Sequence, residues 1–222
     1  VYFLSDLKTS FRINNLEVKP GSKISGSLYV ADRPAHPLEM PLTLVNGTHD
    51  GPLVAISAGV HSSEYVGIAA ALDLIKLLNP EDIYGGLVIV PIVNIPGFEY
   101  RARCTLPIED DYSGTRNLNR IFPGKADGSM AHLINHTFFT QVASKADFLI
   151  DLHGGDIYEQ IHPCTMIYTT GDREFDGKVI GMATASGIGY CIKRSFERQD
   201  GKLVVETAKL GKPGIIIEIG DR

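Results

Sequence analysis

From about residue 46 onwards, short apolar runs alternate with longer segments whose apolar residues recur every three or four positions. The short runs have the length of buried strands and predict strands at residues 53–58, 87–93, 148–152, 190–193, 203–206 and 215–219. The longer segments predict helices at residues 64–78, 130–143 and 174–186. Alternation of this kind predicts an α/β fold, in which helices cover both faces of a twisted, mostly parallel sheet.

The pattern before residue 46 is different. Strand-like segments at residues 11–13, 24–30 and 42–45 are separated by Pro-Gly and Pro-rich turns, without helical segments between them. We therefore predict an N-terminal β arm over residues 1–45 that extends the sheet and makes it mixed, followed by the main domain over residues 46–222. Residues 94–128 form a long irregular stretch, and a loop of this length in a compact domain is usually functional.

Composition narrows the choice of partners. The chain of 222 residues is 44% hydrophobic, which is enough for one α/β domain, and its net charge is −5 without a Lys/Arg block. This balance argues against nucleic acid or an anionic membrane as the partner. The three cysteines are far apart and show no CxxC spacing, so a cytoplasmic location is the simplest interpretation. No apolar stretch reaches the roughly 18–20 residues that span a bilayer.

Three of the predicted strands end on residues that can bind a metal or move a proton. His61 and Glu64 follow the first strand, Asp151 and His153 end the strand that starts at residue 148, and Glu218 ends the last strand. Ligands of open α/β sheets bind outside the carboxyl ends of the strands, so these side chains are expected to converge on one site.

Two histidines and one glutamate are a recognised zinc ligand set. His61, Glu64 and His153 would leave one position of a tetrahedral zinc open for water, as in a catalytic site, and Asp151 could orient the His153 ring. Each motif also has a simpler explanation. Glu64 could complement the dipole of the following helix beside a solvated His61, and a lone His153 could be a core residue in a turn.

Glu218 is unusual at the end of a buried apolar strand. It is either a strand-end residue in solvent or a functional group whose apolar neighbours raise its pKa. A raised pKa would suit a group that takes a proton from water and gives it to a leaving amine. Upstream, Arg116 and Arg120 alternate with asparagines, and an arginine can grip a carboxylate through two hydrogen bonds. Salt bridges on a solvated loop are the alternative for these arginines.

Four segments together resemble the succinylglutamate desuccinylase/aspartoacylase family, which belongs to the wider zinc carboxypeptidase-like group. They are HSSE at residues 61–64, NLNRIFPG at 117–124, DLHG at 151–154 and IEIG at 217–220, in the family's order. The resemblance covers about residues 50–220. It implies a zinc carboxypeptidase-like fold and a zinc hydrolase, with residues 46–222 as catalytic domain, that cleaves the amide bond of N-acyl amino acids.

The resemblance also implies roles for single residues. One Zn²⁺ per chain would be held by His61, Glu64 and His153, and Glu218 would act on its water as general base and acid. Asn119 and Arg120, with Arg116 close by, match the family's grip on the substrate carboxylate. The arginine that polarises the scissile carbonyl matches Arg103 best. Arg101 and Arg116 remain candidates, because residues 104–115 are longer and more acidic than in the family.

Other expectations follow from the same resemblance. Relatives commonly carry a C-terminal β domain that partly roofs the site, and we expect that domain to be absent from this chain, which stops at Arg222. The partner is expected to be a small N-acyl amino acid, and a homo-oligomer is left open. Two other functions remain: a metallocarboxypeptidase that acts on peptides, and a non-catalytic module that binds acyl amino acids.

Overall fold

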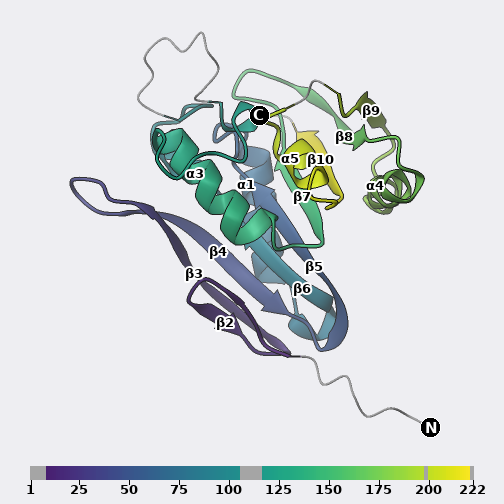
Figure 1. Cartoon of the computed structure of the whole chain (residues 1–222), viewed down its shortest axis with the longest axis horizontal. Helices are drawn as coiled ribbons and strands as arrows, with labels where there is room; N and C mark the ends of the chain where they lie inside the picture. Colours follow the sequence, from purple (N-terminus) through teal and green to yellow (C-terminus); the bar gives the residue numbers. More distant parts are fainter. Residues whose placement is uncertain (1–8, 106–116, 198–199, 221–222) are drawn as a thin grey trace.

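A computed structural model describes residues 9–105, 117–197 and 200–220 (Figure 1). Its centre is an eight-stranded sheet in the order β3-β4-β6-β5-β7-β10-β8-β9, and β1 and β2 form a separate two-stranded sheet. The strands are β1 (Phe11–Ile13), β2 (Leu16–Val18), β3 (Ser22–Ala31), β4 (Leu38–Asn46), β5 (His49–Ala58), β6 (Tyr84–Val90), β7 (Phe148–His153), β8 (Ile161–Thr169), β9 (Cys191–Ser195) and β10 (Gly214–Gly220).

The sheet is mixed, as the sequence predicts. At its centre, strands β6, β5, β7 and β10 run parallel to one another. On one side β4 and β3 add antiparallel strands; on the other β8 is antiparallel to β10 and parallel to β9. The predicted fold class is confirmed, and the N-terminal strands β3 and β4 do extend the main sheet. The expected boundary between residues 45 and 46 falls at the last residue of β4.

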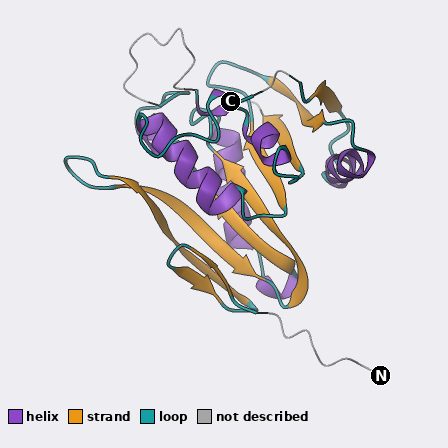
Figure 2. Ribbon diagram, viewed as in Figure 1, coloured by secondary structure: helices purple, strands orange, loops and turns teal. Residues whose placement is uncertain are grey.

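Helices cover both faces of the sheet (Figure 2). The alternation of side chains along β7 shows the two layers: Leu149 packs into the large core cluster on the side of α3 (Met130–Phe138) and α5 (Leu203–Ala208), whereas Ile150 packs with residues of α1 (Tyr65–Leu77) and α4 (Arg173–Ala185). Both faces of β7 are therefore buried under helices, which explains its apolar run. Shorter helical segments are η1 (Pro80–Asp82), α2 (Ile95–Glu99), η2 (Leu118–Arg120) and η3 (Phe139–Ala143). Within the described residues, no helix is long and apolar enough to cross a membrane.

One local prediction was wrong, and one strand was not predicted. Residues 203–206 form the start of helix α5 and not a strand, because a short buried apolar run has the same composition in either state. Tertiary contacts decide here: the side-chain oxygen of Asn119 accepts a hydrogen bond of 3.0 Å from the backbone N–H of Leu203 at the first turn of α5. Strand β8 was not predicted at all, since Pro163 and polar neighbours weaken its pattern.

The parallel strands carry the candidate residues to one edge of the sheet. Ala58 at the end of β5 is aligned with Leu152 on β7, and His153 is aligned with Glu218 on β10. The three segments that follow these strand ends therefore start side by side.

Candidate metal and substrate site

A tight turn between β5 and α1 positions the first two candidate ligands. Gly59 has a φ of 64° and lies against Ile68 and Ile92, so the turn at this position favours a residue that lacks a side chain. His61 follows, and the backbone N–H of Glu64, just before α1, donates to the carbonyl of His61. Both side chains are buried, with 5% and 3% of their surface exposed.

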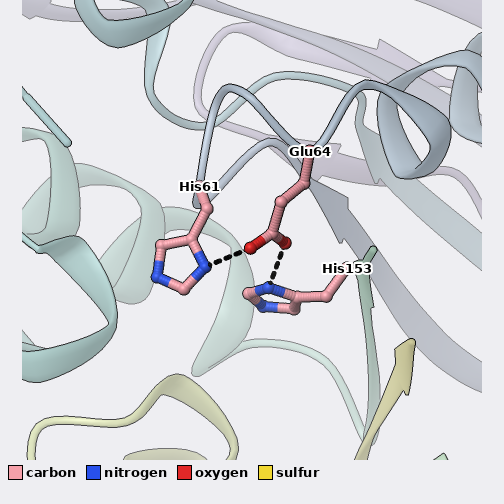
Figure 3. A group of neighbouring side chains, drawn as sticks. All are labelled: His61, Glu64 and His153. Atoms are coloured by element: carbon pink, nitrogen blue, oxygen red, sulfur yellow. Dashed lines mark hydrogen bonds and ion pairs between the residues drawn. The ribbon is translucent and has the colours of Figure 1, made fainter. Parts of the chain in front are cut away.

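The third candidate ligand comes from β7. His153 is buried and points toward the same carboxylate as His61 (Figure 3). His61 Nδ1 lies 2.8 Å from Glu64 Oε1, and His153 Nδ1 lies 2.7 Å from Glu64 Oε2. One ligand atom from each of the three residues lies within 4.8 Å of the others. The structure thus brings together the three residues that the sequence singled out as metal ligands.

The other nitrogen of each imidazole faces an oxygen acceptor. His61 Nε2 lies 3.0 Å from Asn117 Oδ1, an oxygen that also accepts from the backbone N–H of Asn119. His153 Nε2 lies 2.8 Å from Asp151 Oδ2, and Ser57 donates to the other oxygen of Asp151. Both Nε2 atoms are therefore placed to donate a hydrogen bond, as the second nitrogen of a metal-bound histidine usually does.

His61, Glu64 and His153 fit a divalent metal ion. Each Nδ1 faces a carboxylate oxygen of Glu64 at hydrogen-bond distance, so that a proton or a metal ion shared between the two atoms stabilises the contact. Two imidazoles and one carboxylate are a donor set that zinc accepts.

The electrostatics of the cluster also favour a cation. Burial raises the pKa of Glu64, but hydrogen bonds from His153 and His61 outweigh burial and hold the pKa well below its usual range. Burial lowers the pKa of His153, but the charge and hydrogen bond of Asp151 raise it more, so that the net shift is upward. Burial lowers the pKa of His61. Glu64 therefore stays a buried carboxylate between two imidazole rings, which is the charge state that a metal ligand needs.

Glu218 lies beside this cluster with little to stabilise its charge. Burial is the main cause that raises its pKa to about 7; Glu64 and Asp151 also raise it, and His153 acts in the opposite direction. Its Oε2 atom is buried and makes no hydrogen bond within the residues that the structure describes. A half-buried carboxylate with an unused oxygen is available to exchange a proton with a ligand.

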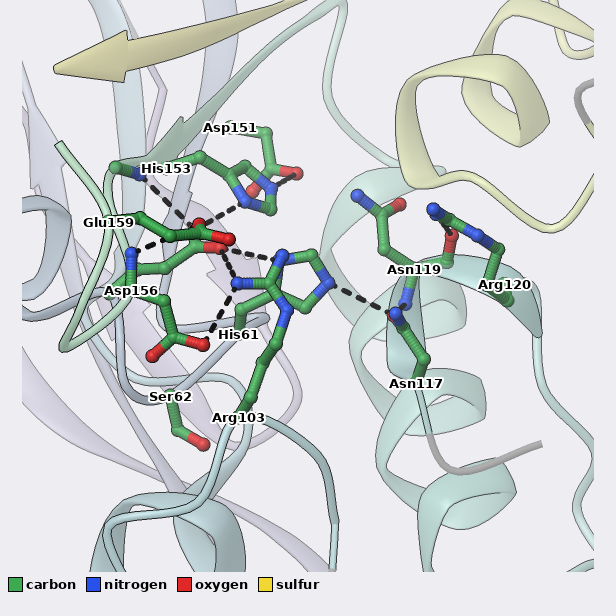
Figure 4. Close-up of polar contacts among 12 residues, drawn as sticks. His61, Ser62, Arg103, Asn117, Asn119, Arg120, Asp151, His153, Asp156 and Glu159 are labelled. Atoms are coloured by element: carbon green, nitrogen blue, oxygen red, sulfur yellow. Dashed lines mark hydrogen bonds and ion pairs between the residues drawn. The ribbon is translucent and has the colours of Figure 1, made fainter. Parts of the chain in front are cut away.

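Arg103 also reaches the cluster (Figure 4). Its Nη1 atom lies 2.8 Å from Glu64 Oε1 and 3.4 Å from Asp156 Oδ2, and its Nη2 atom lies 3.0 Å from His61 Nδ1. The two other arginines considered for this role differ: Arg101 is exposed and does not line the cavity described next, and Arg116 lies outside the described residues.

A cavity of about 250 Å³ opens from the cluster toward β8 and β9. Asn119 and Arg120 of η2, which were expected to bind the substrate carboxylate, line this cavity. Because the Asn119 side-chain oxygen is used by Leu203, its NH₂ group is the part left for a ligand. The lining residues are His61, Arg103, Asn119, Arg120, His153, Met166, Tyr168, Arg194, Lys202, Ile216 and Glu218.

The far end of this cavity was not predicted from the sequence. Its lining includes Tyr168 of β8, Arg194 of β9 and Lys202, the residue before α5. Burial lowers the pKa of Lys202, and the charges of Arg120 and Arg194 lower it further, so the three cations lie close together. Among the described residues, none of the three forms an ion pair. No motif spacing connects these residues in the sequence. Arg194 joins the cavity because β9 pairs with β8, and Lys202 joins it because it precedes α5.

Comparisons with known proteins agree with this architecture. The sequence model of the succinylglutamate desuccinylase/aspartoacylase catalytic domain matches residues 50–222. An N-alpha-acetyl-L-2,4-diaminobutyric acid deacetylase from Halomonas elongata is 33% identical over 183 residues, which are 82% of this chain and 51% of that protein. The chain thus spans about half the length of this curated relative.

Solved structures show the same fold. A succinylglutamate desuccinylase from Silicibacter sp. TM1040 aligns with a TM-score of 0.78 and 25% identity, covering 89% of this chain and 59% of that one. The product-bound structure of an ectoine utilization protein from Ruegeria pomeroyi aligns with a TM-score of 0.74 and 25% identity, covering 89% and 60%.

Proposed function

The chain belongs to the succinylglutamate desuccinylase/aspartoacylase family, and on that premise we propose that it is a zinc-dependent hydrolase that releases free amino acids from N-acyl amino acids. The observation that carries this proposal is the buried cluster of His61, Glu64 and His153 with an unpaired carboxylate, Glu218, beside it in one cavity. Metal ligands alone would suit a structural site. The added carboxylate and the open cavity favour catalysis.

His61, Glu64 and His153 would hold one zinc ion per chain, which would supply a water of lowered pKa and a Lewis acid for the acyl carbonyl. Glu218 accepts the proton of the attacking water and then donates it to the leaving nitrogen. A carboxyl group with a pKa of about 7 can perform both transfers near neutral pH. In balance, one C–O bond forms and the C–N amide bond breaks, which yields a carboxylic acid and an amine.

The remaining residues orient the substrate. The guanidinium of Arg103 can donate hydrogen bonds to the acyl oxygen as negative charge builds on it. Arg120 and the NH₂ group of Asn119 bind the carboxylate of the amino acid on the opposite wall of the cavity. The scissile amide would then lie between these two groups, within reach of Glu218.

The name of the Halomonas relative suggests an acetyl group on the α-nitrogen as the first acyl group to test. The amino acid in the name of that relative, 2,4-diaminobutyric acid, carries an amine side chain, and cations in the cavity of this chain disfavour such a substrate. Arg120, Arg194 and Lys202 line the cavity without ion pairs among the described residues, and one α-carboxylate neutralises only one of them. The cavity therefore favours an amino acid with an acidic side chain.

Product analysis by mass spectrometry tests the proposal. The zinc-loaded protein and a chelated control are incubated with a panel of N-acyl amino acids and short peptides. Release of free amino acid from one acyl class, only in the zinc-loaded sample, is the expected result. Cleavage of the peptides alone would make the chain a metallocarboxypeptidase. Binding of the panel without any product would make it a binding module.

A further inference from the structure

Arg103 contacts two of the three atoms that would bind the metal. Its Nη2 atom lies 3.0 Å from His61 Nδ1, and its Nη1 atom lies 2.8 Å from Glu64 Oε1. The side chain of Arg103 is 37% exposed, whereas that of Glu64 is almost fully buried, so Arg103 reaches into the cluster from the solvent side. The Arg103 guanidinium therefore places a positive charge against atoms that a divalent ion would also bind.

The two cations cannot share His61 Nδ1. His61 Nε2 lies 3.0 Å from Asn117 Oδ1, and a neutral ring that donates to this oxygen has one lone pair, on Nδ1. That lone pair can accept a hydrogen bond from Arg103 or bind a metal, but not both. A guanidinium in contact with Glu64 Oε1 would in addition be repelled by a divalent ion on the same oxygen. The contacts of Arg103 and metal ligation are therefore alternatives.

One other carboxylate is within reach of Arg103 among the described residues. Asp156 Oδ2 lies 3.4 Å from the Arg103 Nη1 atom, and Asp156 is on the segment that follows β7, outside the metal cluster. Its side chain is 25% exposed. A guanidinium that leaves His61 and Glu64 can keep an ion pair by shifting toward this carboxylate.

We propose that Arg103 alternates between His61 and Glu64 in one position and Asp156 in the other, and that a bound divalent metal drives it to Asp156. This inference rests on the metal site of the proposed function. Asp156 is then a positioning residue: it holds Arg103 beside the metal, where the guanidinium faces the substrate cavity instead of the ligand atoms. Arg103 weakens metal binding by competing for the ligands, and Asp156 strengthens it by accepting the displaced side chain.

The test is a double-mutant cycle read out as the zinc dissociation constant, measured by competition with a chromogenic chelator. Arg103→Ala is expected to tighten zinc binding by roughly tenfold, since it removes a charge-assisted hydrogen bond to the ligands. Asp156→Asn is expected to weaken it by roughly three- to tenfold. In the Arg103→Ala background, Asp156→Asn should change the constant by less than about twofold, because no arginine remains to be positioned.

Glu159→Gln is the matched control, since Glu159 lies on the same segment and its carboxylate accepts from the backbone N–H of Asp156. It should leave zinc affinity unchanged. Two results would mean that only the charge of the segment matters, and either would overturn the inference. One is an equal loss of zinc affinity in Glu159→Gln and Asp156→Asn. The other is an effect of Asp156→Asn that persists without Arg103. Weaker zinc binding in Arg103→Ala would also overturn it. Arg103→Gln repeats the cycle if the alanine variant does not fold.

The failure of this inference is distinct from that of the proposed function. If none of the proteins, including the parent, binds zinc, the metal site itself is wrong. If all bind zinc with the parent's affinity, the site stands and the exchange of Arg103 is refuted.

Discussion

Glu218 on β10 is aligned with His153 on β7, because the two residues are partners in the parallel pairing of these strands. The pairing places a carboxylate of raised pKa next to a candidate metal ligand without making it a fourth ligand of the cluster. The geometry separates two tasks, so that one side chain can bind the metal while the other moves a proton.

Because the two tasks lie on different side chains, Glu218→Gln is expected to lower turnover strongly and to leave metal binding unchanged. The amide keeps the size of the side chain but cannot accept the proton of water, so kcat should fall by roughly 10²- to 10⁴-fold. Zinc content, measured by atomic emission after dialysis, should stay at the parental value. Parental turnover in this variant would show that another group is the base.

The pKa of Glu218 predicts the pH profile. The base must be deprotonated to accept a proton, and burial raises the pKa of Glu218 to about 7. The parental kcat/KM should therefore rise with pH up to about 7 and fall roughly tenfold per unit below it. Initial rates from about pH 5 to about pH 8 measure this, with zinc content checked at each pH. A profile that is flat across this range would contradict the assignment.

Asp151 is expected to strengthen metal binding through His153. Its Oδ2 atom accepts the hydrogen of His153 Nε2 at 2.8 Å, which fixes the ring with Nδ1 toward Glu64. Asp151→Asn should weaken zinc binding by roughly 10- to 100-fold. The control is Asp147→Asn, before the start of β7, where the carboxylate accepts from the backbone of Leu53. It should leave the zinc dissociation constant unchanged. Equal losses in both variants would point to a general effect on the strand.

The structure explains why some of the site could be predicted from the sequence. His61, His153 and Glu218 each follow or end an apolar run on adjacent parallel strands, so local patterns and one rule of sheet geometry suffice to bring them together. Arg194 and Lys202 have no such local signal. They join the cavity through the pairing of β9 with β8 and through a helix that resembled a strand in the sequence, and both depend on contacts between distant segments.

A substitution at Gly59 tests the turn that positions His61 and Glu64. Its φ of 64° is unfavourable for a side chain, and an added Cβ would lie 3.2 Å from Ile68 and Ile92. Gly59→Ala should therefore lower the free energy of unfolding by roughly 1–2 kcal/mol. The control is Gly177→Ala in α4, where a Cβ meets nothing within 4 Å. That change should raise the free energy by roughly 0.5–1 kcal/mol, because alanine is the better helix former. Urea unfolding of the chelated proteins measures both, and equal shifts would contradict the role of the turn.

The cations at the far end of the cavity predict a preference for acidic substrates. Arg120, Arg194 and Lys202 lie close together without ion pairs among the described residues, so a side-chain carboxylate should bind better than a neutral group, and an amine should bind worst. The measurement is kcat/KM for Nα-acetyl derivatives of aspartate, alanine and diaminobutyrate.

Lys202→Met should lower kcat/KM for the acidic substrate by roughly tenfold and change the neutral one far less, since it removes a charge but keeps an apolar stem. Lys178→Met is the matched control, because this lysine is exposed on α4 and paired with Glu174. If the diaminobutyrate derivative is the best substrate of the parent, the cations do not select the side chain. They would then have to bind another anionic group of the substrate, such as a carboxylate on the acyl chain, which a series of dicarboxylic acyl derivatives would reveal.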